Sequence, residues 1–120
     1  MYLINIDFNK KNTYANTQFL FKKKELSIDF KDKKNTSFKF NNKFFCLIDG
    51  SIKNNLDKTL SIEVIFNTLS KLKKKKELEN FLNSLWGEFH LFFYSFIEKN
   101  FLLVGDKDGW KQIFYKVNIK

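Results

Sequence analysis

The sequence lacks arginine and proline altogether, and its 120 residues include one cysteine, one histidine and one alanine. A single cysteine, Cys46, excludes an internal disulfide framework and a cysteine-rich zinc site, and a lone His90 offers no histidine cluster for a metal. No apolar run reaches the roughly 18 residues of a transmembrane helix, and the N-terminus lacks the blocks of a secretory signal. We therefore expect a cytoplasmic protein that uses neither a metal nor another cofactor.

The net charge of +9 comes from lysine alone. A basic protein suggests binding to nucleic acid or to an anionic membrane. Recognition of specific bases, however, relies on the planar, bidentate guanidinium group of arginine, which this chain lacks. The run Lys73–Lys76 is interpreted as a solvated helix end. A lysine-rich solvated surface is favoured over nucleic-acid binding, and no membrane contact is predicted. A lysine-rich anion-binding or nucleic-acid-binding module stays as an alternative.

Period-2 alternation and short apolar runs between turn-forming residues predict strands in both halves of the chain. Glu88–Phe96 is apolar on both alternating faces, so we expect it to be covered on both sides. Asp108-Gly109 predicts a tight turn, and the polar segment Lys10–Asn16 a loop. The other strands are predicted at Tyr2–Phe8, Gln18–Lys22, Leu26–Phe30, Ser37–Phe40, Phe44–Asp49, Phe101–Val104 and Gln112–Val117.

The period changes to 3.6 residues from Ser61 onward, which predicts two helices, at residues 61–72 and 77–86. Thr59 or Ser61 is predicted to cap the N-terminus of the first helix. Lys71 and Lys73–Lys76 are predicted to lie in its last turn, where the helix dipole favours positive charge. Gly87 is predicted to end the second helix. The first apolar stripe consists of Ile62, Ile65, Phe66, Leu69 and Leu72, and the second of Leu78, Phe81, Leu82, Leu85 and Trp86. Strands segregated from helices favour a single α+β domain over residues 1–120, with antiparallel sheets.

No constellation of residues predicts catalysis from first principles. Cys46 sits inside a continuous apolar run and is interpreted as a small core residue rather than a nucleophile. His90 is interpreted as a packed or hydrogen-bonded strand residue. The segment Asp106-x-Asp108-Gly109 is similar to part of a calcium loop, but the other ligands are missing. Phosphate-cradling glycine motifs do not occur.

Four segments, in order, resemble the N-terminal glutaminase domain of the asparagine synthetase and β-lactam synthetase family, the class II glutamine amidotransferases. Residues 45–54 (FCLIDGSIKN) resemble the strand and "NGEIYN" turn of that family, and residues 61–65 (SIEVI) its "D-x-E-V-I" helix start. Residues 81–89 (FLNSLWGEF) resemble "FL..L.GMF", and residues 104–115 (VGDKDGWKQIFY) resemble "ARDxxGxxPLYY". Residues 25–28 (ELSI) fall where the family has "RLSI".

The resemblance implies a four-layer αββα sandwich of the N-terminal-nucleophile hydrolase fold, here shortened and possessing a central helix pair. It also implies a structural role for the residues that match the family's motifs. These residues are Gly50, Asn54, Glu63, Gly87, Asp106, Gly109 and Tyr115.

The glutamine-site positions implied by the resemblance are altered. Met1-Tyr2 stands where the family has its N-terminal cysteine nucleophile. The "NGE" turn is Asp49-Gly50-Ser51, so a carboxylate replaces the asparagine that donates to the oxyanion. Ser61 replaces an aspartate that holds the α-amino group of glutamine, and Glu25 replaces an arginine that pairs with its carboxylate. The fold is expected to be kept and the site lost.

The resemblance thus implies a non-catalytic accessory domain. Because β-lactam synthetase relatives keep this domain without the glutaminase nucleophile, the implied partner is a separate synthetase-like, ATP-dependent amide ligase, or the domain self-associates. No SGGxDS pyrophosphate loop occurs in the chain itself. A divergent glutamine-dependent hydrolase that uses Cys46 or Ser51 remains an alternative, as does the anion-binding module.

Overall fold

The computed structural model describes the backbone of residues 4–8, 19–23, 26–30, 36–107 and 110–116. The chain divides into two compact units, Met1–Lys34 and Asn35–Lys120, and each is described by itself. The predicted loop Lys10–Asn16, the predicted turn Asp108-Gly109 and Glu25 lie outside the described residues.

The first unit contains a three-stranded antiparallel sheet. Its strands are β1 (Ile4–Phe8), β2 (Phe19–Lys23) and β3 (Leu26–Phe30), in the order β1-β3-β2. The central strand β3 pairs with both neighbours, so that Ile28 lies opposite Ile6 on one side and Phe21 on the other. All three strands were predicted, β1 from period-2 alternation and β2 and β3 as short runs between turns. The described β1 begins two residues after the predicted start, and β2 is shifted by one residue.

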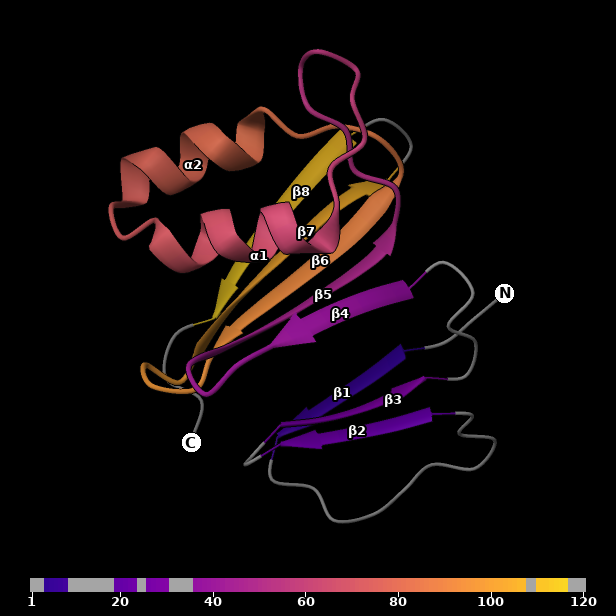
Figure 1. Cartoon of the computed structure of the whole chain (residues 1–120), viewed down its shortest axis with the longest axis vertical. Coiled ribbons are helices and arrows are strands. Elements are labelled where there is room, and N and C mark those ends of the chain that lie inside the picture. Colours follow the sequence, from indigo (N-terminus) through magenta and orange to yellow (C-terminus); the bar gives the residue numbers. More distant parts are fainter. Residues whose placement is uncertain (1–3, 9–18, 24–25, 31–35, 108–109, 117–120) are drawn as a thin grey trace. The chain divides into compact units, whose positions relative to one another are not determined.

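The second unit contains a five-stranded antiparallel sheet in which sequential strands are neighbours. Two helices, α1 (Ile62–Lys71) and α2 (Lys75–Asn83), connect the second strand of the sheet to the third along the chain. Both helices lie on one face of the sheet (Figure 1). This arrangement confirms the α+β class, the antiparallel sheets and the helix pair. The strands are β4 (Thr36–Phe40), β5 (Phe44–Gly50), β6 (Phe89–Ser95), β7 (Asn100–Lys107) and β8 (Trp110–Lys116).

The core lies between the two helices and the sheet. The predicted stripe of α1 supplies Ile65, Phe66 and Leu69, which are buried as expected, and α2 adds the fully buried Leu82. The sheet side of this core includes Cys46, which is completely buried. Cys46 is therefore a core residue, as the apolar run around it predicts.

The opposite face of the sheet is aromatic. Its rings are in contact along and across neighbouring strands; Phe92 lies 6.3 Å from Phe45 and 5.6 Å from Phe101 between ring centroids, and Tyr94 lies 5.1 Å from Phe96. On β6, residues that point to the helices and residues that point away from them are both buried. The prediction that this strand is covered on both faces is confirmed.

The first helix begins where the sequence predicts. Ser61 has an extended backbone, and its hydroxyl accepts a hydrogen bond from the N–H group of Val64 at 3.3 Å, while Glu63 occupies the first turn. An oxygen acceptor and a carboxylate both favour the N-terminal end of a helix dipole. Among the described residues, no helix is long and apolar enough to cross a membrane.

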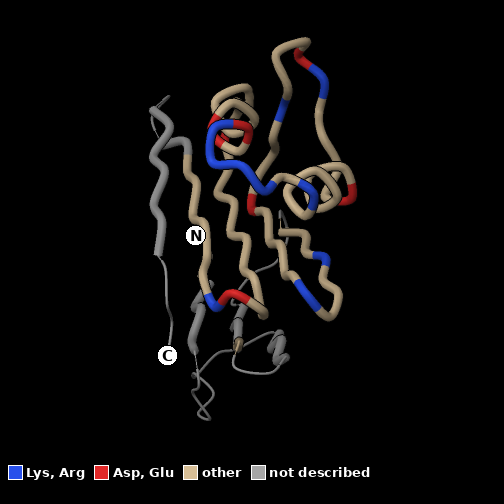
Figure 2. The backbone as a smooth tube through the Cα atoms, turned by 90° about the vertical axis from the view of Figure 1, so that its left-hand side faces the viewer, with Lys and Arg blue, Asp and Glu red and all other residues tan. Residues whose placement is uncertain are grey.

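The prediction that Lys73–Lys76 crowds the C-terminal turn of the first helix is wrong. Helix α1 ends at Lys71, and α2 begins at Lys75, two residues before the predicted start, with Lys74 as an N-cap that makes no side-chain hydrogen bond. The four lysines therefore surround the start of α2, where the dipole disfavours positive charge. They lie at the junction between the helices (Figure 2) and are all exposed, so the prediction that they are solvated is confirmed.

The second helix ends earlier than predicted. Helix α2 stops at Asn83, and Trp86 lies outside it, 45% exposed, in an antiparallel bridge with Lys53. Gly87 is thus not the residue that stops the helix. The backbone N–H group of Trp86 donates to the carbonyl of Lys53 at 3.0 Å. Because this tertiary hydrogen bond uses the N–H group that a continuing helix would need, the helix does not extend to Trp86.

Candidate functional site

The turn after β5 is the place where the resemblance puts the oxyanion donor of a glutaminase. Gly50 has a φ of +99°, and the N–H group of Ser51 donates to the carbonyl of Glu88 at 2.9 Å. A second glycine, Gly87, has a φ of +119° and faces the carbonyl of Ser51. The ends of β5 and β6 are thereby fixed against each other by backbone contacts that only glycine permits.

Asp49 immediately precedes this turn and is a buried carboxylate. The residue is 4% exposed, and its Oδ1 atom has no hydrogen-bond partner among the described residues. Its Oδ2 atom lies 3.7 Å from Nδ1 of His90. Burial raises the pKa of the Asp49 carboxyl above its usual value, and the charge and hydrogen bond of His90 partly oppose this rise.

His90 reaches Asp49 because the two residues are direct partners across β5 and β6. On its other side, His90 lies opposite Gly105 of β7, and a Cβ atom at Gly105 would stand 3.1 Å from the imidazole Cδ2. The imidazole therefore lies in the space that the missing side chain leaves. The His90 side chain is 60% exposed, so the pair has one buried and one solvated member.

The loop that follows Ser51 is held together by Asn54. Its Oδ1 atom accepts hydrogen bonds from the N–H groups of Leu56 at 2.9 Å and Lys58 at 3.1 Å. Its backbone carbonyl accepts from Nε1 of Trp86 at 2.6 Å, and the ammonium group of Lys53 stands 5.5 Å from the centre of the Trp86 rings. Asn54 thus connects the loop to the segment after α2.

The predicted glutamine-site residues are only partly brought together. Asp49, Gly50 and Ser51 are consecutive at the end of β5, and the loop returns the chain to them, since the N–H group of Leu60 donates to the carbonyl of Ile52 at 2.8 Å. Ser61 follows at once, but its hydroxyl is used to cap α1.

Of the remaining predicted residues, two are assigned to strands and two lie outside the described part of the chain. Asp106 lies in β7 and Tyr115 in β8. Glu25 and Gly109 lie outside the described residues.

Cys46 belongs to a different environment from Asp49, although both lie on β5. Three residues of separation place their side chains on opposite faces of the strand, and Cys46 contributes to the core beneath the helices. Burial raises the pKa of the Cys46 thiol far above its usual range, so the nucleophilic thiolate is strongly disfavoured. Within the described part of the chain, no group of three or more His, Cys, Asp or Glu side chains could hold a metal ion.

Comparison with protein-family models, with curated proteins and with solved structures gives no match to this chain. The likeness to the amidotransferases therefore depends on the motifs in the sequence alone.

The pairing of Asp49 with His90 is the feature that the sequence did not reveal. The register of β5 against β6 is unknown before the fold is known, so the sequence does not place the two side chains together. The only signal in the sequence was that both residues stand within three positions of a turn glycine, Gly50 or Gly87.

We expect Asp49→Asn to stabilise the protein by about 1 kcal/mol at pH 7, since it removes a buried charge with an unpartnered oxygen. The folded-state pKa of Asp49 is raised, so the folded protein binds the proton more tightly. Ionisation then lowers stability as pH rises from the ordinary value of 3.8 through the folded-state pKa. The difference in the free energy of unfolding between Asp49→Asn and the parent should accordingly shrink as pH falls towards 3.8.

Urea unfolding of both proteins at pH 7 and pH 4 measures this difference. Glu88→Gln, which neutralises an exposed carboxylate at the same end of the sheet, serves as the control and should change stability little at either pH. An Asp49→Asn protein less stable than the parent at pH 7 would show that the carboxylate is paired favourably.

Proposed function

We propose that this chain is a non-catalytic, amidotransferase-like accessory domain, which binds a separate ATP-dependent amide-forming ligase in the cytoplasm. The observation that carries the proposal is the buried carboxylate of Asp49 at the turn where the resemblance requires an oxyanion donor. A carboxylate there repels the developing negative charge of a tetrahedral intermediate, whereas a glutaminase needs a hydrogen-bond donor aimed at it.

The surroundings of the candidate nucleophiles also support a non-catalytic role. The thiol of Cys46 is buried on the helix side of the sheet, away from the Asp49 turn. Ser51 is exposed in that turn, but the one histidine of the chain, His90, lies beside Asp49. An activated hydroxyl needs a base within hydrogen-bond reach, which no described contact provides.

A binding role is supported by the apolar surface of the loop after β5. Leu56 is 72% exposed and Trp86 is 45% exposed, and Asn54 and Lys53 hold the Trp86 rings in place. Exposed tryptophan held in one position is typical of residues that dominate the binding energy of protein interfaces. We place the ligase-binding surface on Trp86 and Leu56.

The proposal is tested by affinity capture of the tagged protein from its own cells, followed by identification of what is retained. The expected result is a ligase that carries an ATP-binding pyrophosphate loop, in about equal amount with the bait. Trp86→Ala should reduce this capture at least tenfold, because a buried aromatic anchor contributes about 2 kcal/mol or more. Leu56→Ser should have a similar effect, because complete burial of a leucine side chain contributes about 1.5–3 kcal/mol.

Ile97→Ala is the matched control, because Ile97 is also exposed but lies beyond the other end of β6. Capture of no protein, or only of proteins without a ligase domain, would refute the proposal. The purified protein should also release no ammonia from glutamine. Ammonia release that Cys46→Ala or Ser51→Ala abolishes would support the hydrolase instead.

A further inference from the structure

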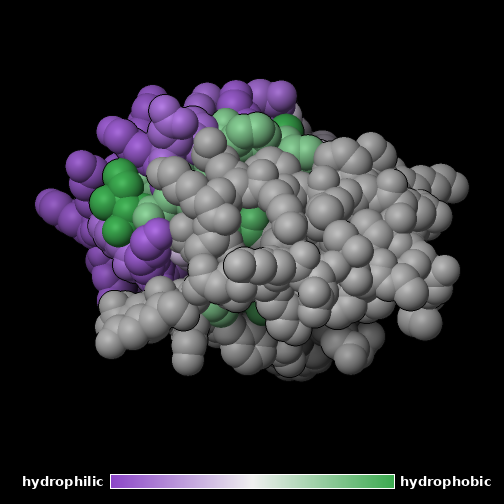
Figure 3. All heavy atoms as spheres, turned by 90° about the horizontal axis from the view of Figure 1, so that it is seen from below, coloured by the Kyte–Doolittle hydropathy of each residue, from purple (hydrophilic) through white to green (hydrophobic). Residues whose placement is uncertain are grey.

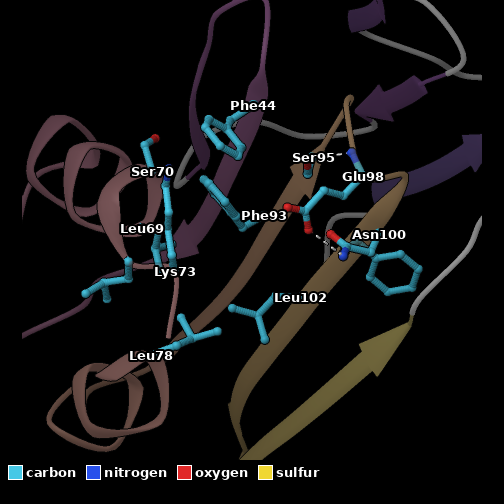
Figure 4. Close-up of a pocket in the computed structure, with 12 residues that line it drawn as sticks. Phe44, Leu69, Ser70, Lys73, Leu78, Phe93, Ser95, Glu98, Asn100 and Leu102 are labelled. Carbon is cyan, nitrogen blue, oxygen red and sulfur yellow. Dashed lines mark hydrogen bonds between the residues drawn. The ribbon is translucent and has the colours of Figure 1, made fainter. Parts of the chain in front are cut away.

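A pocket of about 330 Å³ lies between the helix pair and the sheet, at the end opposite the Asp49 turn. The start of β5 and the turn between β6 and β7 contribute to it, together with the junction of α1 and α2 (Figure 4). Its volume is at the lower end of the range for small-molecule sites. Its apolar lining includes Leu69, Leu72, Leu78, Phe93 and Leu102.

The pocket carries one positive and one negative side chain, from different elements. Lys73 comes from the helix junction and Glu98 from the β6–β7 turn (Figure 4). Neither group forms an ion pair within the described part of the chain, and in particular they do not pair with each other. Two opposite charges that have no ionic partner among the described residues, beside an apolar lining, form a charge pattern that a ligand can complement.

Glu98 is held in position by its own turn. Its backbone N–H group donates to the hydroxyl of Ser95 at 3.1 Å, and its Oε2 atom accepts from Nδ2 of Asn100 at 3.2 Å. Ser95 is itself buried at the pocket wall. The carboxylate is thus oriented before any ligand arrives, which lowers the entropic cost of binding.

Seen from below the view of Figure 1, most of the described surface consists of hydrophilic residues, and apolar residues form small patches (Figure 3). A purely apolar ligand would leave both charges of the pocket unpaired, and a purely anionic one would face the carboxylate of Glu98. A zwitterion with an apolar body satisfies all three features.

We propose that this pocket binds an apolar α-amino acid, whose carboxylate pairs with Lys73, whose ammonium group pairs with Glu98 and whose side chain enters the apolar lining. The inference does not depend on the proposed accessory role. For a ligand the size of phenylalanine in a partly open pocket, we expect a Kd on the order of 1 mM.

The test is a titration of the isotopically labelled whole chain with L-phenylalanine, followed by the shifts of its backbone amide resonances. Shifts are expected at Ser70, Lys73, Glu98 and Asn100. Phenylacetate and 2-phenylethylamine keep the aromatic body but lack one charge each. Each should bind about three- to tenfold more weakly, because an exposed charge pair contributes modestly.

Lys73→Gln and Glu98→Gln should each weaken binding of L-phenylalanine by a similar factor. Lys75→Gln and Glu77→Gln remove the same charges from exposed positions nearby that do not line the pocket, and should leave the Kd unchanged. The inference is overturned if pocket resonances do not shift or if phenylacetate binds as tightly as phenylalanine. It is equally overturned if Glu98→Gln has no effect.

Discussion

Replacing Gly50 by alanine is expected to destabilise the protein by about 3 kcal/mol or more. Its φ of +99° is a conformation that residues with a Cβ atom rarely adopt. A Cβ atom would also overlap the carbonyl oxygen of Glu88 and stand 3.0 Å from the Cα atom of Phe89. These neighbours are backbone atoms of the first residue of β6 and of the residue before it, so relief requires a shift in the pairing of β5 with β6.

Gly87→Ala should have a similar effect, since its φ is +119° and a Cβ atom would stand 2.5 Å from the carbonyl oxygen of Ser51. Gly105→Ala is the matched control. There the nearest atom is in the His90 side chain, at 3.1 Å, and that side chain can rotate away. We expect Gly105→Ala to change stability by less than about 1 kcal/mol.

Chemical denaturation at pH 7 measures all three variants against the parent protein. If Gly50→Ala were no less stable than Gly105→Ala, the result would contradict the close backbone contact between Gly50 and the Glu88 carbonyl. A loss of stability confined to Gly50 and Gly87 would establish that this turn holds the sheet, whatever the protein binds.

The thiol of Cys46 is expected to react with a disulfide reagent about a thousandfold or more slowly in the folded protein than in denaturant. The side chain is completely buried, and burial raises the pKa of its thiol far above the usual range. Reaction then requires opening of the core, which in a typical small domain costs about 5 kcal/mol or more, and each 1.4 kcal/mol is a factor of ten.

The labelling rate at pH 7, with and without denaturant, checks this expectation. Gly50→Ala should lower the free energy of opening the core, so Cys46 of the folded variant should be labelled faster than Cys46 of the folded parent. This comparison distinguishes protection by burial from an intrinsically slow reaction of the thiol. Rapid labelling of the folded parent would show an accessible thiolate and would revive the hydrolase alternative. Mild slowing below tenfold would contradict the position of Cys46 in the core.

Much of the fold was predictable because it depends on local periodicity. The alternation of Ile4 and Ile6 with Asn5 and Asp7, and the helical spacing of Ile65 and Leu69, are properties of neighbouring residues. Strand and helix positions in the described chain follow these patterns. The burial of Cys46 was also predictable, because its run is apolar on both sides.

The helix boundaries were less predictable. Four lysines after Lys71 favour the end of a helix, yet Lys73–Lys76 surround the start of the next one. The amphipathic spacing continues to Trp86, but a backbone pairing with Lys53, distant in sequence, takes this residue out of the helix. At Trp86, tertiary hydrogen bonds with Lys53 overrode local propensity.

By itself the sequence determined the α+β class, the antiparallel strands and the core stripe of α1. Only the tertiary structure decided that Asp49 meets His90, and that Lys73 and Glu98 share a pocket. The reason is physical: periodicity assigns a side chain to a face of one element, whereas the residue it meets depends on register and packing between elements. Those follow from the whole core and not from any short stretch.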